Sequence, residues 1–229
     1  MLHDPPLLTI KKDFARAPQA ALDALAEAQT GHVVDALLGR GAMDASIKAI
    51  DNDRAQFIGT AFPVETGPSD NLAIAAGVAL AKEGDVIVGA CDAFERTAVC
   101  GDIVAMLGQN AGCAALVLDG MVRGVVGLVE VGLPIFARGI TPNSCVRSGP
   151  GRVGLPIVAG GVRVEAGDVV KGDLDGVVVI PRAEVDRVVA AVQEICAAET
   201  VTIEDVQSGR TRMPFMDDLL RSERVKYVD

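Results

Sequence analysis

Residues 101–124 have the sequence GDIVAMLGQNAGCAALVLDGMVRG, and this stretch decides the fold. It predicts a helix over DIVAMLGQN that Gly112 closes, then a buried strand over AALVL that runs into a turn at Asp119-Gly120. The turn presents Arg123. An arginine close to a helix N-terminus can hold a carboxylate or phosphate, because free amides, the helix dipole and a guanidinium fork all favour an anion. We therefore expect an anion site here; the alternative is a surface ion pair of Arg123.

The same alternation of helix and strand continues on both sides of this stretch. Apolar periodicity and turn residues predict helices at 18–29, 32–40, 71–83 and 125–132, and strands at 47–51, 56–66, 85–90 and 133–139. Alternating elements of this kind are typical of a parallel sheet with right-handed crossovers. Residues 91–100 predict a loop, as does the Gly- and Pro-rich segment 141–154, which we expect to be functional or to pack on a partner. Short strands follow, and Pro181 starts a long helix.

Composition limits the classes of function. The chain has 229 residues, of which 50% are hydrophobic and 3% aromatic, so we expect one domain with an aliphatic core. The net charge of −10 argues against a nucleic acid or an anionic membrane as partner. No apolar run is long enough to span a membrane, and the N-terminus is too polar for a signal peptide, so we expect a cytoplasmic protein. Five cysteines without a Cys-x-x-Cys pair fit reduced thiols, and two distant histidines argue against a catalytic triad.

Several short motifs occur in the order found in one known family. They are DNLAI at 70–74, GDVIV at 84–88, GDIVA at 101–105, DGMVRG at 119–124, PIFARGITP at 134–142 and the long run GPGRVGLPIVAGGVRVEAGDVVKGDLDGVVVIP at 149–181. Over about residues 25–210 the chain resembles the RraA-like family, which includes the regulator of ribonuclease E activity A and the 4-hydroxy-4-methyl-2-oxoglutarate aldolases.

The resemblance implies the fold and the assembly. The expected fold is an α/β, three-layer domain of the swivelling β/β/α type, with a mixed central sheet and flanking helices. It would form a single domain over 1–229, with its core at about 25–210, an N-terminal arm and a C-terminal tail. The resemblance also implies a homotrimer, or a hexamer of two stacked trimers, with active sites in clefts between neighbouring subunits.

The resemblance also implies a chemistry and a set of site residues. The aldolase members are class II carbon–carbon lyases, with an oxaloacetate decarboxylase activity of the same type. In them a divalent metal, Mg²⁺ or Mn²⁺, binds a small 2-oxo (di)carboxylate and pyruvate leaves as its enolate. The expected catalytic residues are Arg123, Asp102 and Glu199, the last resembling an acid that family members send into a neighbour's site. The expected substrate-binding residues are Gly101, Asp102, Ile103, Val104 and Arg123.

The chain departs from the family at the metal. The family has an aspartate directly after the arginine, as its protein metal ligand, and the aldolases have an acid three positions further on. Here these positions are Gly124 and Gly127, so the sequence predicts no metal ligand. We interpret Asp119 as a turn residue. The candidates to replace the missing metal ligand are nevertheless Asp102, Asp119 and Glu199. Asp92 and Glu95 are further acidic candidates. Glu199 could equally lie on a solvated helix face.

Three functions are therefore open. The first is a lyase of the aldolase or decarboxylase type that releases pyruvate from a 2-oxo acid. The second is a non-catalytic regulator that binds other proteins. The third is a metal-independent enzyme that keeps the carboxylate site and uses Asp102 or Glu199 as its base.

Overall fold

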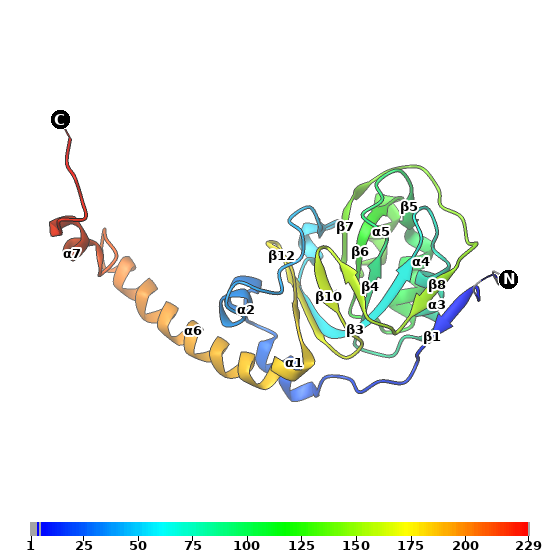
Figure 1. Ribbon diagram of the computed structural model, residues 1–229, viewed down its shortest axis with the longest axis horizontal. Coiled ribbons are helices and arrows are strands. Elements are labelled where there is room, and N and C mark those ends of the chain that lie inside the picture. The colour runs from blue at the N-terminus through cyan, green and yellow to red at the C-terminus, as the bar shows by residue number, and fades with distance from the viewer. Residues whose placement is uncertain (1–3, 5, 229) are drawn as a thin grey trace. The chain divides into compact units, whose positions relative to one another are not determined.

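The computed structural model describes residues 4 and 6–228, which belong to two compact units. Unit 1 comprises Met1–Val192 and unit 2 comprises Gln193–Asp229. Unit 1 holds the sheet and the helices around it (Figure 1). The residues of the candidate site also belong to unit 1. That both units form the single domain expected over 1–229 stays a prediction.

A mixed sheet, ten-stranded among the described residues, forms the centre of unit 1. Its strands are β1 (Leu8–Ile10), β2 (Lys48–Ala49), β3 (Phe57–Thr66), β4 (Asp85–Ala90), β5 (Ala98–Cys100), β6 (Ala115–Val122), β7 (Ile135–Ile140), β8 (Gly151–Val153), β11 (Val169–Asp173) and β12 (Gly176–Ile180). The main order is β1-β8-β3-β4-β6-β7-β2, with β11 beside β3, β12 beside β11, and β5 beside β6. The neighbours β3, β4, β6 and β7 are parallel, as the alternation of helix and strand predicts.

Three helices provide the crossovers between these parallel strands. They are α3 (Leu72–Leu80), α4 (Asp102–Asn110) and α5 (Val125–Val131), and their bounds follow the sequence predictions closely. They pack on one face of the sheet around fully buried side chains such as Phe62, Ile74 and Leu116. Because α4 and α5 begin where β5 and β6 end, their N-termini lie together at the carboxyl edge of the parallel strands.

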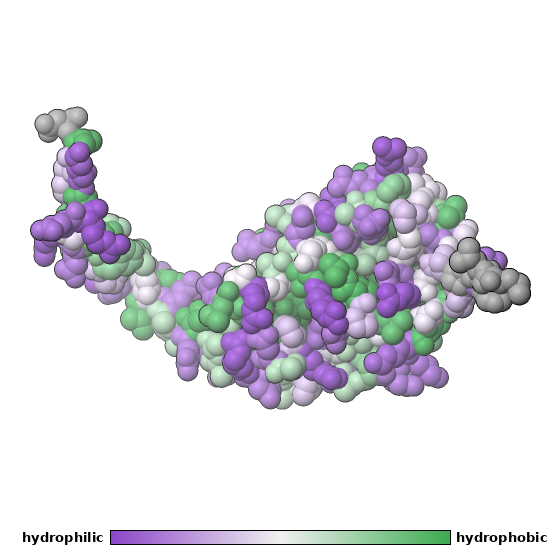
Figure 2. Space-filling view, in the orientation of Figure 1, coloured by the Kyte–Doolittle hydropathy of each residue, from purple (hydrophilic) through white to green (hydrophobic). Residues whose placement is uncertain are grey.

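A hairpin covers the other face of the sheet. It consists of β9 (Ile157–Ala159) and β10 (Val162–Val164), which pair antiparallel. A second core cluster lies beneath it, with Phe57 packing edge to face on Phe136 at 5.3 Å between ring centroids. Helices, sheet and hairpin thus form three layers (Figure 1), which confirms the predicted α/β fold of the β/β/α type. On the face seen in Figure 2, hydrophobic side chains gather over the middle of the sheet beside the hairpin.

A buried carboxylate holds the segment that follows β1 against the sheet. The Arg16 guanidinium donates two hydrogen bonds to Asp85, at 2.8 and 2.7 Å, and lies 4.4 Å from the Phe14 ring centroid. Helices α1 (Gln19–Leu25) and α2 (Thr30–Ala36) follow. Gln29 is the N-cap of α2, and the Thr30 amide and hydroxyl that follow it both donate to Asp173, at 2.7 Å each.

The last long helix joins the two units. After a 3₁₀ turn at Arg182–Glu184, α6 spans Val185–Gln207, and its buried residues are Val185, Val188 and Val192 in unit 1. Unit 2 contains the rest of α6 and the short helix α7 (Met216–Arg221). No described helix combines the length and the apolar character needed to cross a lipid bilayer.

Several local predictions are wrong, among them the loop over 141–154, whose end forms β8 (Gly151–Val153). Two others concern the end of β6. The expected turn at Asp119-Gly120 lies inside β6, which continues to Val122. Asp119 is held in the sheet because its Oδ1 accepts a hydrogen bond from Arg138 Nε and its Oδ2 accepts one from the Gly160 amide at 3.0 Å. The loop predicted over 91–100 contains a short strand, β5, because its last residues pair with the end of β6. Both errors come from long-range pairing that local turn signals do not report.

Candidate functional site

A cavity of about 100 Å³ lies at the N-terminus of α4. The N-cap residue Gly101 is extended, and no side chain caps the helix, so no side-chain acceptor occupies the first-turn amides. Arg123 lines the cavity together with the first turn of α4. The structure therefore brings together all five predicted substrate-binding residues, which are Gly101, Asp102, Ile103, Val104 and Arg123. Their function in binding stays a prediction.

Arg123 is positioned by the end of β6 and by a glycine. Its amide donates to the Cys100 carbonyl at 3.0 Å, which fixes the backbone next to α4. A Cβ on Gly101 would lie 3.5 Å from Arg123 Cγ, so the arginine stem passes directly over this residue. Arg123 Nη1 donates to Ser144 Oγ at 2.5 Å, from the loop that follows β7. None of the ion pairs between described residues involves this guanidinium, and the anion site stays a prediction.

Asp102 points toward α5, where two glycines leave room for it. A Cβ on Gly127 would lie 2.8 Å from Asp102 Cβ and 2.9 Å from its Oδ2. A Cβ on Gly124 would lie 3.8 Å from Asp102 Oδ1. The Asp102 carboxylate thus occupies the space into which side chains at positions 124 and 127 would point. It is the only carboxylate among the described residues that line the cavity.

The sequence did not single out Asn71, which is 5% exposed and lines the same cavity. Its Nδ2 donates to the Val99 carbonyl at 3.0 Å, but its Oδ1 has no partner within the described chain. A buried acceptor without a donor costs roughly 1–3 kcal/mol, so a bound group with a hydroxyl or amine would relieve it. The cavity therefore offers positive charge for an anion and one acceptor for a hydrogen-bond donor.

The predicted loop 141–154 contributes a second arginine that sequence reasoning did not name. Arg147 lines the cavity, and its side chain has no hydrogen bond or ion pair to another described residue. Its neighbours in the chain are fixed by Asp70, whose Oδ2 accepts from the amides of Ser148 and Gly149 at 2.5 and 2.9 Å. Burial tends to raise the pKa of Asp70, but hydrogen bonds from Leu72, Ser148 and Gly149 outweigh it and hold that pKa below its ordinary value.

Two cysteines of the cavity are protonated thiols. Burial raises the pKa of Cys100 to about 12 and also raises the pKa of Cys145. Both shifts disfavour the thiolate, which is the nucleophilic form of cysteine.

The other acidic candidates lie elsewhere. Asp119 is paired inside the sheet with Arg138, which removes it as a replacement metal ligand. Glu199 lies exposed on α6 in unit 2, and its role stays a prediction. Glu95 is exposed and does not line the cavity, whereas Asp92 lines a different one.

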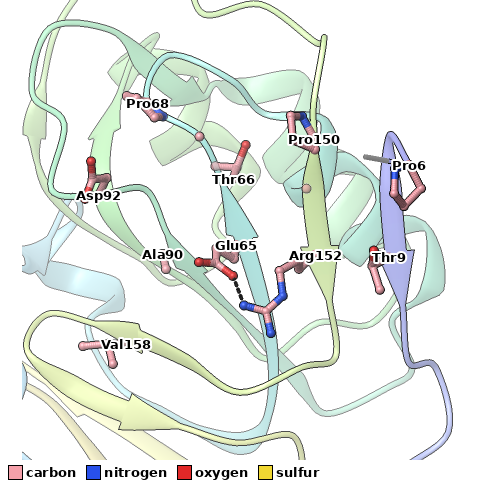
Figure 3. Close-up of a pocket in the computed structure, with 12 residues that line it drawn as sticks. Pro6, Thr9, Glu65, Thr66, Pro68, Ala90, Asp92, Pro150, Arg152 and Val158 are labelled. Carbon is pink, nitrogen blue, oxygen red and sulfur yellow. Dashed lines mark hydrogen bonds and ion pairs between the residues drawn. The ribbon is translucent and has the colours of Figure 1, made fainter. Parts of the chain in front are cut away.

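That different cavity is larger, at about 510 Å³, and lies between the ends of β3 and β4 and the strands β1 and β8. Figure 3 shows Glu65 and Arg152 facing one another in it, with Pro68 and Pro150 above them. Arg152 Nη1 donates to Glu65 Oε2 at 2.5 Å, so these two charged groups of the larger cavity already pair with each other. The small cavity, with unpaired charges, is the better candidate site.

The residues at the small cavity do not fit the divalent metal that the family resemblance implies. Gly124, at the position where the resemblance leads us to expect a ligand, has a left-handed backbone with φ of +73°. No three His, Cys, Asp or Glu side chains of the described chain come together as a metal site. One carboxylate beside two guanidiniums is a poor donor set for a hard cation, which prefers several oxygen ligands.

Comparison with known proteins agrees with the fold. The model of the RraA-like family, Aldolase/RraA, matches residues 30–179. A protein of Halalkalibacterium halodurans, provisionally named a 4-hydroxy-4-methyl-2-oxoglutarate aldolase, is 35% identical over 156 residues, which are 68% of this chain and 74% of that protein. An uncharacterized protein from Pseudomonas syringae has a TM-score of 0.75 and 25% identity, covering 86% of this chain and 97% of that one.

A further solved relative carries a different function in its name. The RNA-processing inhibitor RraA from Thermus thermophilis has a TM-score of 0.62 and 29% identity, covering 68% of this chain and 93% of that one. The match of the family model over residues 30–179, together with the identity to the Halalkalibacterium protein, shows that this chain belongs to the RraA-like family.

Proposed function

We propose that this chain is a carbon–carbon lyase that cleaves a small 2-oxo (di)carboxylate and releases pyruvate. The observation that carries the proposal is the 100 Å³ cavity at the uncapped N-terminus of α4, lined by Arg123 and by the unpartnered Asn71 Oδ1. Its size suits the three-carbon end of a 2-oxo acid. The helix dipole and the guanidinium fork favour a carboxylate, and the Asn71 acceptor favours a ligand that also bears a hydroxyl.

Asp102 is the base in this proposal. It removes the proton from the hydroxyl of a 4-hydroxy-2-oxo acid, and the bond between C4 and C3 breaks. The electron pair of that bond moves into the enolate of pyruvate, while C4 leaves as the carbonyl carbon of the second product. The proton then returns to C3 and gives pyruvate. With oxaloacetate the same enolate forms as CO₂ leaves, and the proton comes from the solvent or from an acid.

The proposal includes a homotrimer, or a hexamer of two trimers, that brings Glu199 of a neighbouring copy to the site. An exposed apolar surface beside the cavity supports it: Ile103, Met106 and Leu107 on α4 and Val126 and Val129 on α5 are all exposed. A contiguous apolar surface next to a functional site is typical of a protein interface.

Calorimetric measurement of carboxylate binding tests the site. Arg123→Ala should weaken the binding of oxalate or pyruvate by about 2–3 kcal/mol, the range for a charge-assisted hydrogen bond. Arg163→Ala is the matched control, because Arg163 pairs with Glu165 on the surface and does not line the cavity. Equal affinity in wild type and Arg123→Ala would disprove the site.

The reaction itself is tested by a lactate dehydrogenase coupled assay of pyruvate release. Wild-type protein should release pyruvate from 4-hydroxy-4-methyl-2-oxoglutarate or oxaloacetate, and Asp102→Asn should slow it, since general bases contribute about 10²–10⁴-fold. Absence of pyruvate with both substrates would instead favour the second candidate, a protein-binding regulator. That candidate rests on the likeness to the RNA-processing inhibitor RraA.

A further inference from the structure

Two guanidiniums face the small cavity, and only one carboxylate does. Arg123 and Arg147 both line it, with Asp102 as the single acid among the described lining residues. Arg123 accounts for the carboxylate group of the substrate. The Arg147 side chain makes no hydrogen bond or ion pair to another described residue, so no contact of this kind gives it a role in stabilising the fold. An unpaired cation in a site that binds a 2-oxo acid is free to contact a second oxygen of that ligand.

The backbone on both sides of Arg147 is held in place. Before it, the Val146 amide donates to the Ser69 carbonyl at 2.8 Å, and the Val146 carbonyl accepts from the Asn71 amide at 3.1 Å. After it, Asp70, which is 4% exposed, accepts from the next two amides. Although it stands in a loop rich in Gly and Pro, Arg147 is therefore carried by a backbone segment that is fixed next to Asn71. This backbone places its exposed side chain at the cavity.

The difficult part of the proposed reaction is the negative charge that develops on the 2-oxo oxygen. In the metal-dependent family members a divalent cation meets that charge. Here the residue at the ligand position is Gly124, and the donor set at the cavity does not suit such an ion.

Resting on the lyase activity proposed above, we propose that Arg147 takes over this task and that the chain binds its 2-oxo acid without a metal. On cleavage, the electron pair of the broken bond forms the enolate, and the N–H groups of Arg147 donate to the enolate oxygen. The planar guanidinium can donate through two N–H groups in parallel, which suits the planar enolate.

Oxalate is the probe, because it mimics the planar enolate of pyruvate. Calorimetric titration in EDTA should give the same affinity as titration with Mg²⁺. Arg147→Ala should weaken oxalate binding about 10–100-fold, which follows from a lost charged hydrogen bond, and Arg147→Lys should recover only part of it. Arg163→Ala should bind as wild type does.

The outcomes separate this inference from the function on which it rests. Oxalate binding that needs Mg²⁺, or that is unchanged in Arg147→Ala while Arg123→Ala loses it, would overturn the role of Arg147 and leave the carboxylate site intact. No oxalate binding by wild type under either condition would overturn both.

A direct metal measurement gives a second readout. In the presence of oxalate, the electron paramagnetic resonance signal of free Mn²⁺ should stay unchanged on adding wild-type protein. Gly124→Asp places a second carboxylate beside Asp102, with 3.8 Å from the new Cβ to Asp102 Oδ1, and should bind Mn²⁺. Gly124→Asn is the matched control, since Asn tolerates the same left-handed backbone without adding charge. Stoichiometric Mn²⁺ binding by wild type that Asp102→Asn abolishes would refute the proposal.

Discussion

Gly127→Ala tests whether the packing of α4 against α5 sets the position of Asp102. In a helix interior, replacing Gly by Ala normally stabilises by about 0.5–1 kcal/mol. Here, however, the new Cβ would lie 2.8 Å from Asp102 Cβ, an atom fixed to the backbone that cannot rotate away. Ordinary contact begins at 3.4 Å, so α4 and α5 must separate by about 0.6 Å or more. Overpacking of this kind costs about 1–3 kcal/mol, which outweighs the gain in helix propensity.

The first turn of α4 carries the amides and the carboxylate of the site, so this displacement should also affect function. A misplacement of about 1 Å can lower a rate about 10²-fold, and we expect pyruvate release to fall roughly 10- to 100-fold in Gly127→Ala. Oxalate affinity should fall less, because Arg123 is not displaced by this contact. The assays are urea unfolding for stability and the coupled assay for pyruvate.

Gly31→Ala is the matched control for this variant. Gly31 also lies in a helix, α2, but nothing comes within 4 Å of a Cβ placed there. This change should therefore raise the free energy of unfolding by about 0.5–1 kcal/mol and leave activity unchanged. If Gly127→Ala were stabilised to the same extent and kept full activity, the contact between Asp102 and Gly127 would not control the site.

Two further predictions concern stability and assembly. Asp70→Asn should lower the free energy of unfolding by roughly 1–3 kcal/mol at pH 7, because the amide nitrogen of Asn only donates and cannot accept the backbone hydrogen bonds at either of the two oxygen positions of Asp70. The folded-state pKa of Asp70 is lowered, so this stabilisation is present above its ordinary pKa of 3.8 and is lost as pH falls toward the folded-state value. The difference in the free energy of unfolding between variant and wild type, measured with urea, should therefore shrink on acidification. A constant difference would argue against the ionised carboxylate. Light scattering at micromolar concentration should give the mass of a trimer or hexamer, and a monomer would refute any site completed by Glu199 of a neighbouring copy.

Most of the fold follows from local sequence signals. The helix DIVAMLGQN begins after Gly101 and ends before Gly112 as its caps predict, and α5 ends at Gly132, which has φ of +75°. The parallel core strands follow from the alternation of apolar runs with helices. What local signals could not give was the pairing of distant residues: Asp119 resembles a turn residue, but Arg138 from the neighbouring strand holds it inside the sheet.

The site could be predicted in part for the same reason. Arg123 and the first turn of α4 belong to the same helix–strand unit, residues 101–124, so their proximity follows from one local motif. Asn71 and Arg147 reach the cavity through a bridge between Asp70 and Val146, which no periodicity reports. The one available signal for Arg147 was the length of the loop 141–154, which predicts function without naming the residue.

The exchange of a metal for a guanidinium has a consequence for which substrates can react. A single positive charge about 4 Å from the enolate oxygen stabilises the enolate by about 4 kcal/mol at an effective dielectric constant of 20. A divalent ion at the same distance stabilises it by about twice as much, and it can also approach the oxygen more closely. With Arg147 in place of the metal, the barrier to enolate formation therefore stays several kcal/mol higher, which corresponds to a rate at least about 10²–10³-fold lower for the same substrate. The site compensates best with substrates whose carbon–carbon bond breaks readily. Oxaloacetate, which loses neutral CO₂, fits this condition better than a 4-hydroxy-2-oxo acid that must also give up its hydroxyl proton to Asp102.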